Sequence, residues 1–362
     1  MWIYLFNIIT IPIYSRLIKD RKKFIILVAL QLFLILALRS VTLGVDLSNY
    51  SAGYEYIGKL SFEEMTSRLG PMGMSKLIYP FDYENGYTIM NWLSSQIGFS
   101  FHGFLVICAA INIGTISAFI YKYSKKPWLS FVIFSAFGFY AYSFGIIRQS
   151  LALSFVLLSY MCLDKKKYFF AILSFVMAFL CHRSAVVAII PLILMWRRSV
   201  TITKKRFALL LFFSLPVMLF SNVIYNDVIV KVMSFMGKGY AGHDFTMNNM
   251  LLLLFGISLV MMIFCNFSKI KDKMPTVSCY ALILAVYFSI CGLYNDNFAR
   301  ALQFLSVFLV ILIPEVFDQY KGQKAAFVIE VIVYLLLFGF MCYDISGSAI
   351  DPYILNCEGF LW

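Results

Sequence analysis

The sequence contains few charged residues, since only 13% are Asp, Glu, Lys or Arg while 62% are hydrophobic. Soluble domains carry about 25% charged residues, so a 362-residue chain of this composition is not expected to cover itself with a polar surface in water. Basic residues exceed acidic ones by 12, but they lie in short clusters between apolar runs. A nucleic-acid-binding protein would gather them on one face. The composition predicts an integral membrane protein with no nucleic-acid partner.

Histidine and paired cysteine motifs are also scarce. The chain has three histidines, and its eight cysteines include no C-x-x-C spacing, so we expect neither a structural zinc site nor a cofactor. Asp82 and Glu84 form a short acidic pair that keeps a divalent cation open as an alternative. No basic residue precedes the first apolar segment, and we therefore expect no cleavable signal peptide.

The basic clusters predict the topology. Six of them hold 21 of the 30 Lys and Arg residues, and the positive-inside rule places all six in the cytoplasm. Each apolar stretch between two clusters must then cross the membrane and return, which gives an all-α polytopic protein with about twelve transmembrane helices. We expect one integral membrane domain, 1–362, with extracytoplasmic loops 42–100 and 225–247. The predicted crossings lie near 1–15, 24–41, 101–121, 128–144, 146–163, 168–181, 184–196, 207–224, 248–267, 276–293, 301–314 and 325–343, and whether 1–15 spans stays open.

Four arginines fall at the outer ends or tips of these apolar segments: Arg39, Arg148, Arg183 and Arg300. A single arginine there can snorkel to lipid headgroups. Four at one depth favour a multiply charged ligand, because guanidinium forks match phosphate oxygens in pairs. Pyrophosphate is the natural candidate.

His182 lies between Cys181 and Arg183 at a predicted outside tip. It is either a hydrogen-bonded turn residue or a general base near neutral pH. Asp46 and Glu84, in the first outside loop, are the competing bases. Tyrosines surround these acids, and Tyr50 and Tyr87 are the candidates for stacking on sugar rings, although membrane interfaces also collect tyrosine.

At these residues the sequence resembles the EpsG family of exopolysaccharide and O-antigen polymerases, which are of the Wzy type. The matching pieces run in that family's order over nearly the whole chain. They are Leu38-Arg39, Gly44-Val45-Asp46 with Tyr50, Glu84-Asn85-Gly86-Tyr87, Ile147-Arg148-Gln149-Ser150-Leu151-Ala152, His182-Arg183-Ser184-Ala185 and a late Arg300. The family usually pairs its histidine with a small residue, and here Arg183 follows instead.

The resemblance implies a membrane-embedded glycosyltransferase with a GT-C-like architecture and no metal. It would move a growing glycan from undecaprenyl pyrophosphate to the terminal sugar of another lipid-linked repeat unit, with inversion, at the outer face of the bacterial cytoplasmic membrane. His182, Asp46 or Glu84 would supply the base. Arg39, Arg148, Arg183, Arg300 and Gln149 would bind pyrophosphate.

Its expected partners are the lipid-linked donor and acceptor, membrane lipid and a chain-length regulator protein. A glycan ligase that uses the same donor is the nearest alternative, and a flippase of the lipid-linked unit is the next. A flippase is expected to carry charges along a central cavity, whereas here they collect on one face.

Overall fold

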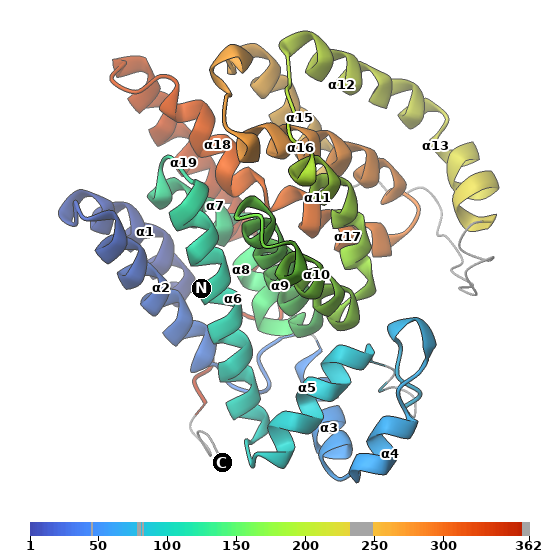
Figure 1. Cartoon of the computed structure of the whole chain (residues 1–362). Helices are drawn as coiled ribbons and strands as arrows, with labels where there is room; N and C mark the ends of the chain where they lie inside the picture. Colours follow the sequence, from blue (N-terminus) through green and yellow to red (C-terminus); the bar gives the residue numbers. More distant parts are fainter. Residues whose placement is uncertain (45, 78–80, 82, 232–248, 357–362) are drawn as a thin grey trace. The chain divides into compact units, whose positions relative to one another are not determined.

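The computed structural model describes residues 1–44, 46–77, 81, 83–231 and 249–356, and the regular elements in this part of the chain are helical (Figure 1). Helix accounts for 77% of the structure, which confirms the all-α prediction. The chain divides into two compact units. Unit 1 comprises Met1–Val186 and Gln323–Trp362, and unit 2 comprises Val187–Gly322.

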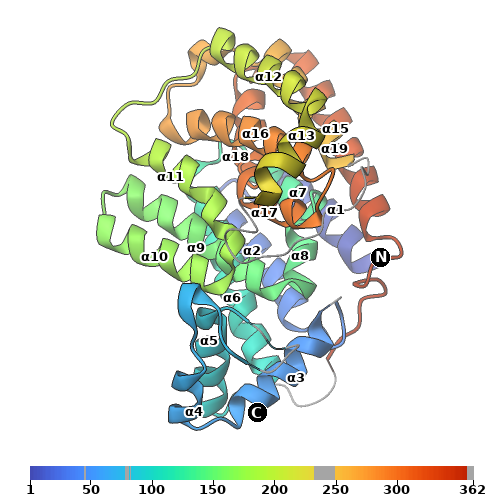
Figure 2. The ribbon, with the colours of Figure 1, turned by 90° about the vertical axis from the view of Figure 1, so that its right-hand side faces the viewer.

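Unit 1 is organised around the long apolar helix α6 (Phe101–Tyr123). Ser100 caps this helix by accepting a hydrogen bond from Gly103 N at 3.1 Å. α6 packs against α2 and α9, and α9 runs beside α10 (Figures 1 and 2). The other helices of the unit are α1 (Trp2–Leu17), α2 (Arg21–Ala37), α3 (Leu47–Gly58), α4 (Phe62–Ser67), η1 (Pro71–Gly73), α5 (Asn85–Gln96), α7 (Pro127–Ala136), α8 (Phe139–Gly145), α9 (Ile147–Asp164), α10 (Tyr168–Cys181), η2 (Arg183–Ala188), whose last two residues fall in unit 2, and α19 (Lys324–Ile345).

The apolar run 128–144, predicted as one crossing, is broken in the structure. α7 ends at Ala136 and α8 begins at Phe139, with a bend of 50° between them. Gly138 lies at the break with φ +76°, a left-handed conformation that glycine adopts without the Cβ clash of other residues. The glycine therefore ends one helix and starts the next within the same apolar stretch.

The long loop 42–100 is folded rather than extended. α3, α4 and α5 lie together beside the N-terminal end of α6, in the blue and cyan part of Figures 1 and 2. Ser61 and Glu64 begin α4 with a reciprocal capping box, in which Ser61 Oγ accepts from Glu64 N at 3.2 Å and Glu64 Oε2 accepts from Ser61 N at 2.8 Å. This helical loop region carries one of the predicted bases, Glu84, into a defined position.

Unit 2 is organised around α16 (Lys273–Cys291), whose side chains are buried on several sides. It packs against α11, α12, α15, α17 and α18. Of the predicted loop 225–247, residues 232–247 lie outside the described part of the chain. The remaining helices of unit 2 are α11 (Ile189–Trp196), α12 (Lys204–Leu219), α13 (Ser221–Val223), the π-helix η3 (Ile224–Ile229), α15 (Asn249–Phe264), η4 (Phe267–Lys269), α17 (Asp296–Ser306) and α18 (Leu309–Asp318).

Several helices are suited to a lipid environment. Within the described residues, four helical stretches are long and apolar enough to cross a membrane, or five if the bent pair α7 and α8 counts as one span. α19 also exposes large apolar side chains, with Phe327 and Leu336 58% and 67% accessible, which water would disfavour. These features support a membrane protein. The predicted number of about twelve crossings remains a prediction, because α10 has only 14 residues and about 20 are usual for a span.

Candidate active site

Glu84 is fixed at the start of α5 by the turn before it. Ser75 donates twice to the Tyr83 carbonyl, from its backbone N at 2.9 Å and from Oγ at 2.5 Å. The carbonyl of Glu84 then accepts from Thr88 N at 3.0 Å and so begins the helix. With its backbone already committed to this N-cap position, Glu84 has its carboxylate available for contacts with other elements.

Gly86 lets α5 approach the end of α10 at backbone distance. A Cβ at this position would lie 2.8 Å from Leu180 Cβ and 2.9 Å from the Leu180 carbonyl oxygen, which is closer than real Cβ atoms come to such neighbours. Any other residue here must push the two helices apart. Since Glu84 and His182 each lie two residues from this contact, the glycine determines how closely their side chains meet.

His182 terminates α10 in an extended conformation, with its backbone N donating to Ala178 O at 2.9 Å. Its Nδ1 lies 3.1 Å from Glu84 Oε1, and the backbone N of Arg183 donates to the same oxygen at 3.4 Å. The two side chains are largely buried, with Glu84 5% and His182 13% accessible. The carboxylate therefore holds the imidazole ring in one orientation.

Arg148, the second residue of α9, occupies the other carboxylate oxygen. Its Nη1 donates to Glu84 Oε2 at 2.7 Å, and its Nε donates to the Tyr50 hydroxyl at 3.3 Å. The guanidinium carbon lies 5.0 Å from the ring centre of Tyr83 and 5.6 Å from that of Tyr50, within the range of cation–π attraction. Nη2 has no partner in the described part of the chain and stays available to a ligand.

The ionisation of Glu84 determines where the proton lies in the Glu84–His182 pair. Burial disfavours its charged form, but the hydrogen bond from His182 and the charge of Arg148 outweigh that effect and lower the pKa of Glu84 to about 2. An ionised carboxylate only accepts hydrogen bonds, so the proton between the two side chains belongs to His182 Nδ1. In the neutral ring the lone pair then resides on Nε2.

His182 Nε2 is buried, and it makes no hydrogen bond to any described residue. A buried polar atom without a partner is uncommon in native proteins and calls for an explanation. An incoming hydroxyl group would give this nitrogen the donor it lacks. The arrangement of Glu84, His182 and Nε2 is that of an oriented general base.

Asp46 lies in the same region of unit 1. Gly44, with φ +138°, contacts the chain just before Arg148, since a Cβ on it would lie 2.7 Å from Gly145 Cα. Asp46 follows at the N-cap of α3 and is half-buried, one helical turn before Tyr50. Its carboxylate makes no hydrogen bond or ion pair with the described residues. Asp46 thus remains an alternative base beside the Glu84 group.

Within unit 1, the structure brings two of the predicted pyrophosphate ligands close to His182. Arg183 is adjacent, and its half-buried guanidinium forms no hydrogen bond or ion pair within the described ranges. Gln149 follows Arg148 on α9 but is only 1% accessible. Arg300 belongs to unit 2, where it is exposed on α17. The structure therefore brings Arg148 and Arg183 to the histidine.

Arg39 differs from the expectation of an open phosphate ligand. It is 1% accessible and donates to the Leu36 and Ser143 carbonyls, with its guanidinium carbon 5.6 Å from the Phe144 ring centre. The segment around Leu355 lies against Arg39, because the backbones of these two residues form an isolated antiparallel bridge. In this conformation Arg39 is enclosed by protein, and it contributes to packing rather than to an accessible anion site.

Tyr50 and Tyr87 are likewise enclosed, at 3% and 0% accessible. Their ring centres lie 5.6 Å apart, and Tyr83 contacts both rings at 5.7 and 5.3 Å. Stacking of these two rings on sugars stays a prediction, and in this conformation both rings are covered by protein. Tyr50 and Tyr83 pack against the guanidinium of Arg148, and Tyr87 contacts both of these rings. Burial raises the pKa of Tyr50 despite the nearby guanidinium.

Two residues of this site are not identified from the sequence. Nothing local to Tyr83 indicates that it packs on Arg148. Gly86 stands in the sequence only as part of a motif, and its position two residues after Glu84 is the one signal of a close backbone approach. No group of three or more metal-binding side chains occurs among the described residues, and Asp82, of the acidic pair with Glu84, lies outside them.

Comparison with known proteins gives one informative result. Searches of curated proteins and of solved structures found no match. The model of the EpsG family matches residues 22–355, which is nearly the whole chain and includes every residue of the site described above. The protein therefore belongs to the EpsG family, a family of Wzy-like polysaccharide polymerases.

Proposed function

We propose that this protein polymerises a polysaccharide by transferring the growing glycan from undecaprenyl pyrophosphate to a second lipid-linked repeat unit. We place the reaction at the outer face of the bacterial cytoplasmic membrane, in a GT-C-like protein with about twelve crossings. Family membership supports a polymerase of this general type. The observation that carries the mechanism is His182 Nε2, which is buried and forms no hydrogen bond with the described residues, while an ionised Glu84 holds Nδ1.

The reaction needs little covalent chemistry from the protein. The terminal hydroxyl of the acceptor attacks the anomeric carbon, its proton passes to His182 Nε2, and the bond from the anomeric carbon to the pyrophosphate oxygen breaks. The electron pair leaves with undecaprenyl pyrophosphate. One direct displacement inverts the anomeric centre. A general base of this kind contributes about 10²–10⁴-fold in rate.

The departing pyrophosphate accumulates negative charge, which fixed cations stabilise. Arg148 is held on one edge by Glu84 and Tyr50, and its Nη2 has no partner among the described residues, so it is oriented before the ligand arrives. Arg183 adds a second guanidinium beside His182 and has no competing partner in the described chain. We assign the pyrophosphate to these two arginines. Asp46 would serve as the base if His182 only orients the leaving group.

The test is the lipid-linked product in cells that lack this gene, since the possible roles act at different steps. Single finished repeat units at the outer face support the polymerase. Units trapped inside would identify a flippase, and full-length polymer that is not joined to its final acceptor would identify a ligase. A chain-length regulator, the partner we expect, should change the length of the polymer in cells that carry this gene, without being needed for its synthesis.

A further inference from the structure

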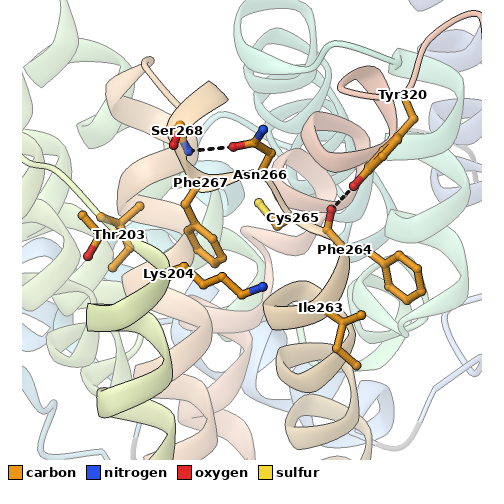
Figure 3. Close-up of a pocket in the computed structure, with 10 residues that line it drawn as sticks. Thr203, Lys204, Ile263, Phe264, Cys265, Asn266, Phe267, Ser268 and Tyr320 are labelled. Atoms are coloured by element: carbon orange, nitrogen blue, oxygen red, sulfur yellow. Dashed lines mark hydrogen bonds between the residues drawn. The ribbon is translucent and has the colours of Figure 1, made fainter.

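Unit 2 contains a pocket that the proposed reaction does not use. Its volume is about 380 Å³, and it lies where the start of α12, the end of α15, η4 and Tyr320 meet (Figure 3). Its apolar wall is formed by Ile202, Ile263, Phe264 and Phe267. The segments around it include two of the basic clusters that the sequence places on the cytoplasmic side.

The polar side of the pocket favours an anion. Lys204 extends from the first turn of α12 toward α15 in Figure 3, and it forms no ion pair within the described chain. Asn266 Oδ1 accepts from Ser268 N at 3.1 Å, which turns the amide so that its NH₂ group remains a donor. The lining includes no acid. The first-turn backbone N–H groups of a helix add further positive potential.

An apolar stripe leads away from this pocket along α15. Leu252, Gly256, Val260 and Phe264 are spaced by four residues and so share one helix face. Leu252, Val260 and Phe264 are 57%, 55% and 49% accessible, and a Cβ at Gly256 would meet nothing within 4 Å. The stripe ends at Phe264, which lines the pocket. A molecule with an anionic head and a hydrocarbon tail matches both parts.

We propose that this pocket binds the phosphate of an anionic phospholipid from the surrounding membrane, with an acyl chain lying along the α15 stripe. Lys204 provides the charge, and Asn266 and Ser268 provide neutral hydrogen-bond donors. Basic pockets between transmembrane helices bind lipid phosphates in this way. A free phosphate would use the same polar groups but would gain nothing from the stripe.

The experiment uses the purified full chain in a neutral detergent, with thermal unfolding measured as phosphatidylglycerol or phosphatidylcholine is added. The variants are Lys204→Gln and its control Lys205→Gln. Both lysines are exposed in the first turn of α12, so the two changes alter net charge equally, but only Lys204 lines the pocket.

We expect phosphatidylglycerol to raise the unfolding temperature of the wild type more than phosphatidylcholine does. Lys204→Gln should need about fivefold more phosphatidylglycerol for the half-maximal effect, the size expected for one basic residue beside an anionic lipid. Lys205→Gln should stay close to wild type, and Lys204→Arg should retain binding.

Equal losses in the two glutamine variants would reduce the effect to bulk charge and overturn the proposal. Equal stabilisation by phosphatidylcholine would remove the role of the anionic head. The last measurement adds inorganic phosphate in place of lipid. If it stabilises the protein as well as phosphatidylglycerol does at the same concentration, the pocket is a free-anion site and the lipid assignment is wrong.

Discussion

Glu84→Gln is the most informative single change, because Glu84 contacts both His182 and Arg148. The amide replaces an ionised acceptor with a group that can donate or accept. If its NH₂ faces His182, Nδ1 becomes the acceptor and the proton moves to Nε2, where it blocks base catalysis. Arg148 loses its ion pair in either orientation. We expect activity to fall by about 10²–10⁴-fold, the usual contribution of a general base.

The same change should cost stability, by an amount that follows from the pKa. The pKa of Glu84 is about 2, against a usual value of 4.5. At about 1.4 kcal/mol per pKa unit, this difference corresponds to roughly 3 kcal/mol. Because the folded-state pKa is depressed, this stabilisation is fully present above about pH 4.5 and disappears as the pH falls toward 2.

The assay compares unfolding temperature and polymer synthesis for the wild type, Glu84→Gln and Glu55→Gln. Glu55 is exposed on α3 in the same loop region and has no partner among the described residues, so it controls for the loss of one acid. The difference between wild type and Glu84→Gln should be largest near neutral pH and should shrink below pH 4.5. Glu55→Gln should behave as wild type.

Two results would contradict the role of the ionised Glu84. If Glu84→Gln polymerises at the wild-type rate, the carboxylate does not set the protonation of His182, and Asp46 becomes the proposed base. If its stability deficit is the same at pH 7 and at pH 3, the ionised form of Glu84 is not what stabilises the fold.

Three further changes test the parts of the site separately. Arg148→Lys should lose nearly as much activity as Arg148→Ala, because one ammonium cannot bind Glu84, Tyr50 and a phosphate together. The control is Arg68→Lys, which should keep polymer length normal because the Arg68 side chain has a single tyrosine partner. Gly86→Ala should lower stability by about 1–3 kcal/mol through overpacking and reduce activity. Its control is Gly114→Ala, where the added Cβ meets nothing within 4 Å, and this variant should be neutral or stabilising. Unchanged activity in Gly86→Ala would show that the close approach of α5 to α10 is dispensable. His182→Ala should be inactive and partly rescued by added imidazole, and a folded His182→Gln with full activity would exclude the base role.

Helix positions could largely be predicted from the sequence because apolar runs between basic clusters are a strong signal. The predicted segment 168–181 coincides with α10, and 101–121 and 325–343 lie within α6 and α19. The break at Gly138 was missed because it lies inside an uninterrupted apolar run, where hydropathy carries no information about a single backbone angle. The positions of the basic clusters likewise do not indicate that loop 42–100 folds into helices.

The site was predicted in part. The sequence predicts Arg148 and His182 at outside tips and Glu84 in the first outside loop, but residues 98 positions apart give no sign of a shared hydrogen bond. Depth in the membrane also does not tell which way a side chain faces. Arg39 was therefore grouped with Arg148, although it is enclosed by backbone carbonyls and Phe144. For the same reason, the sequence does not show that Tyr50 and Tyr87 are enclosed.

The most direct test supplies the purified protein with a lipid-linked repeat unit of its own pathway and resolves the products by size. We expect a ladder of lipid-linked glycans that grows by one repeat unit per step, with inverted configuration at each new bond and with no ladder from His182→Gln. A ladder of undiminished yield from folded His182→Gln, or transfer of single units to an acceptor other than a second repeat unit, would exclude the proposed reaction.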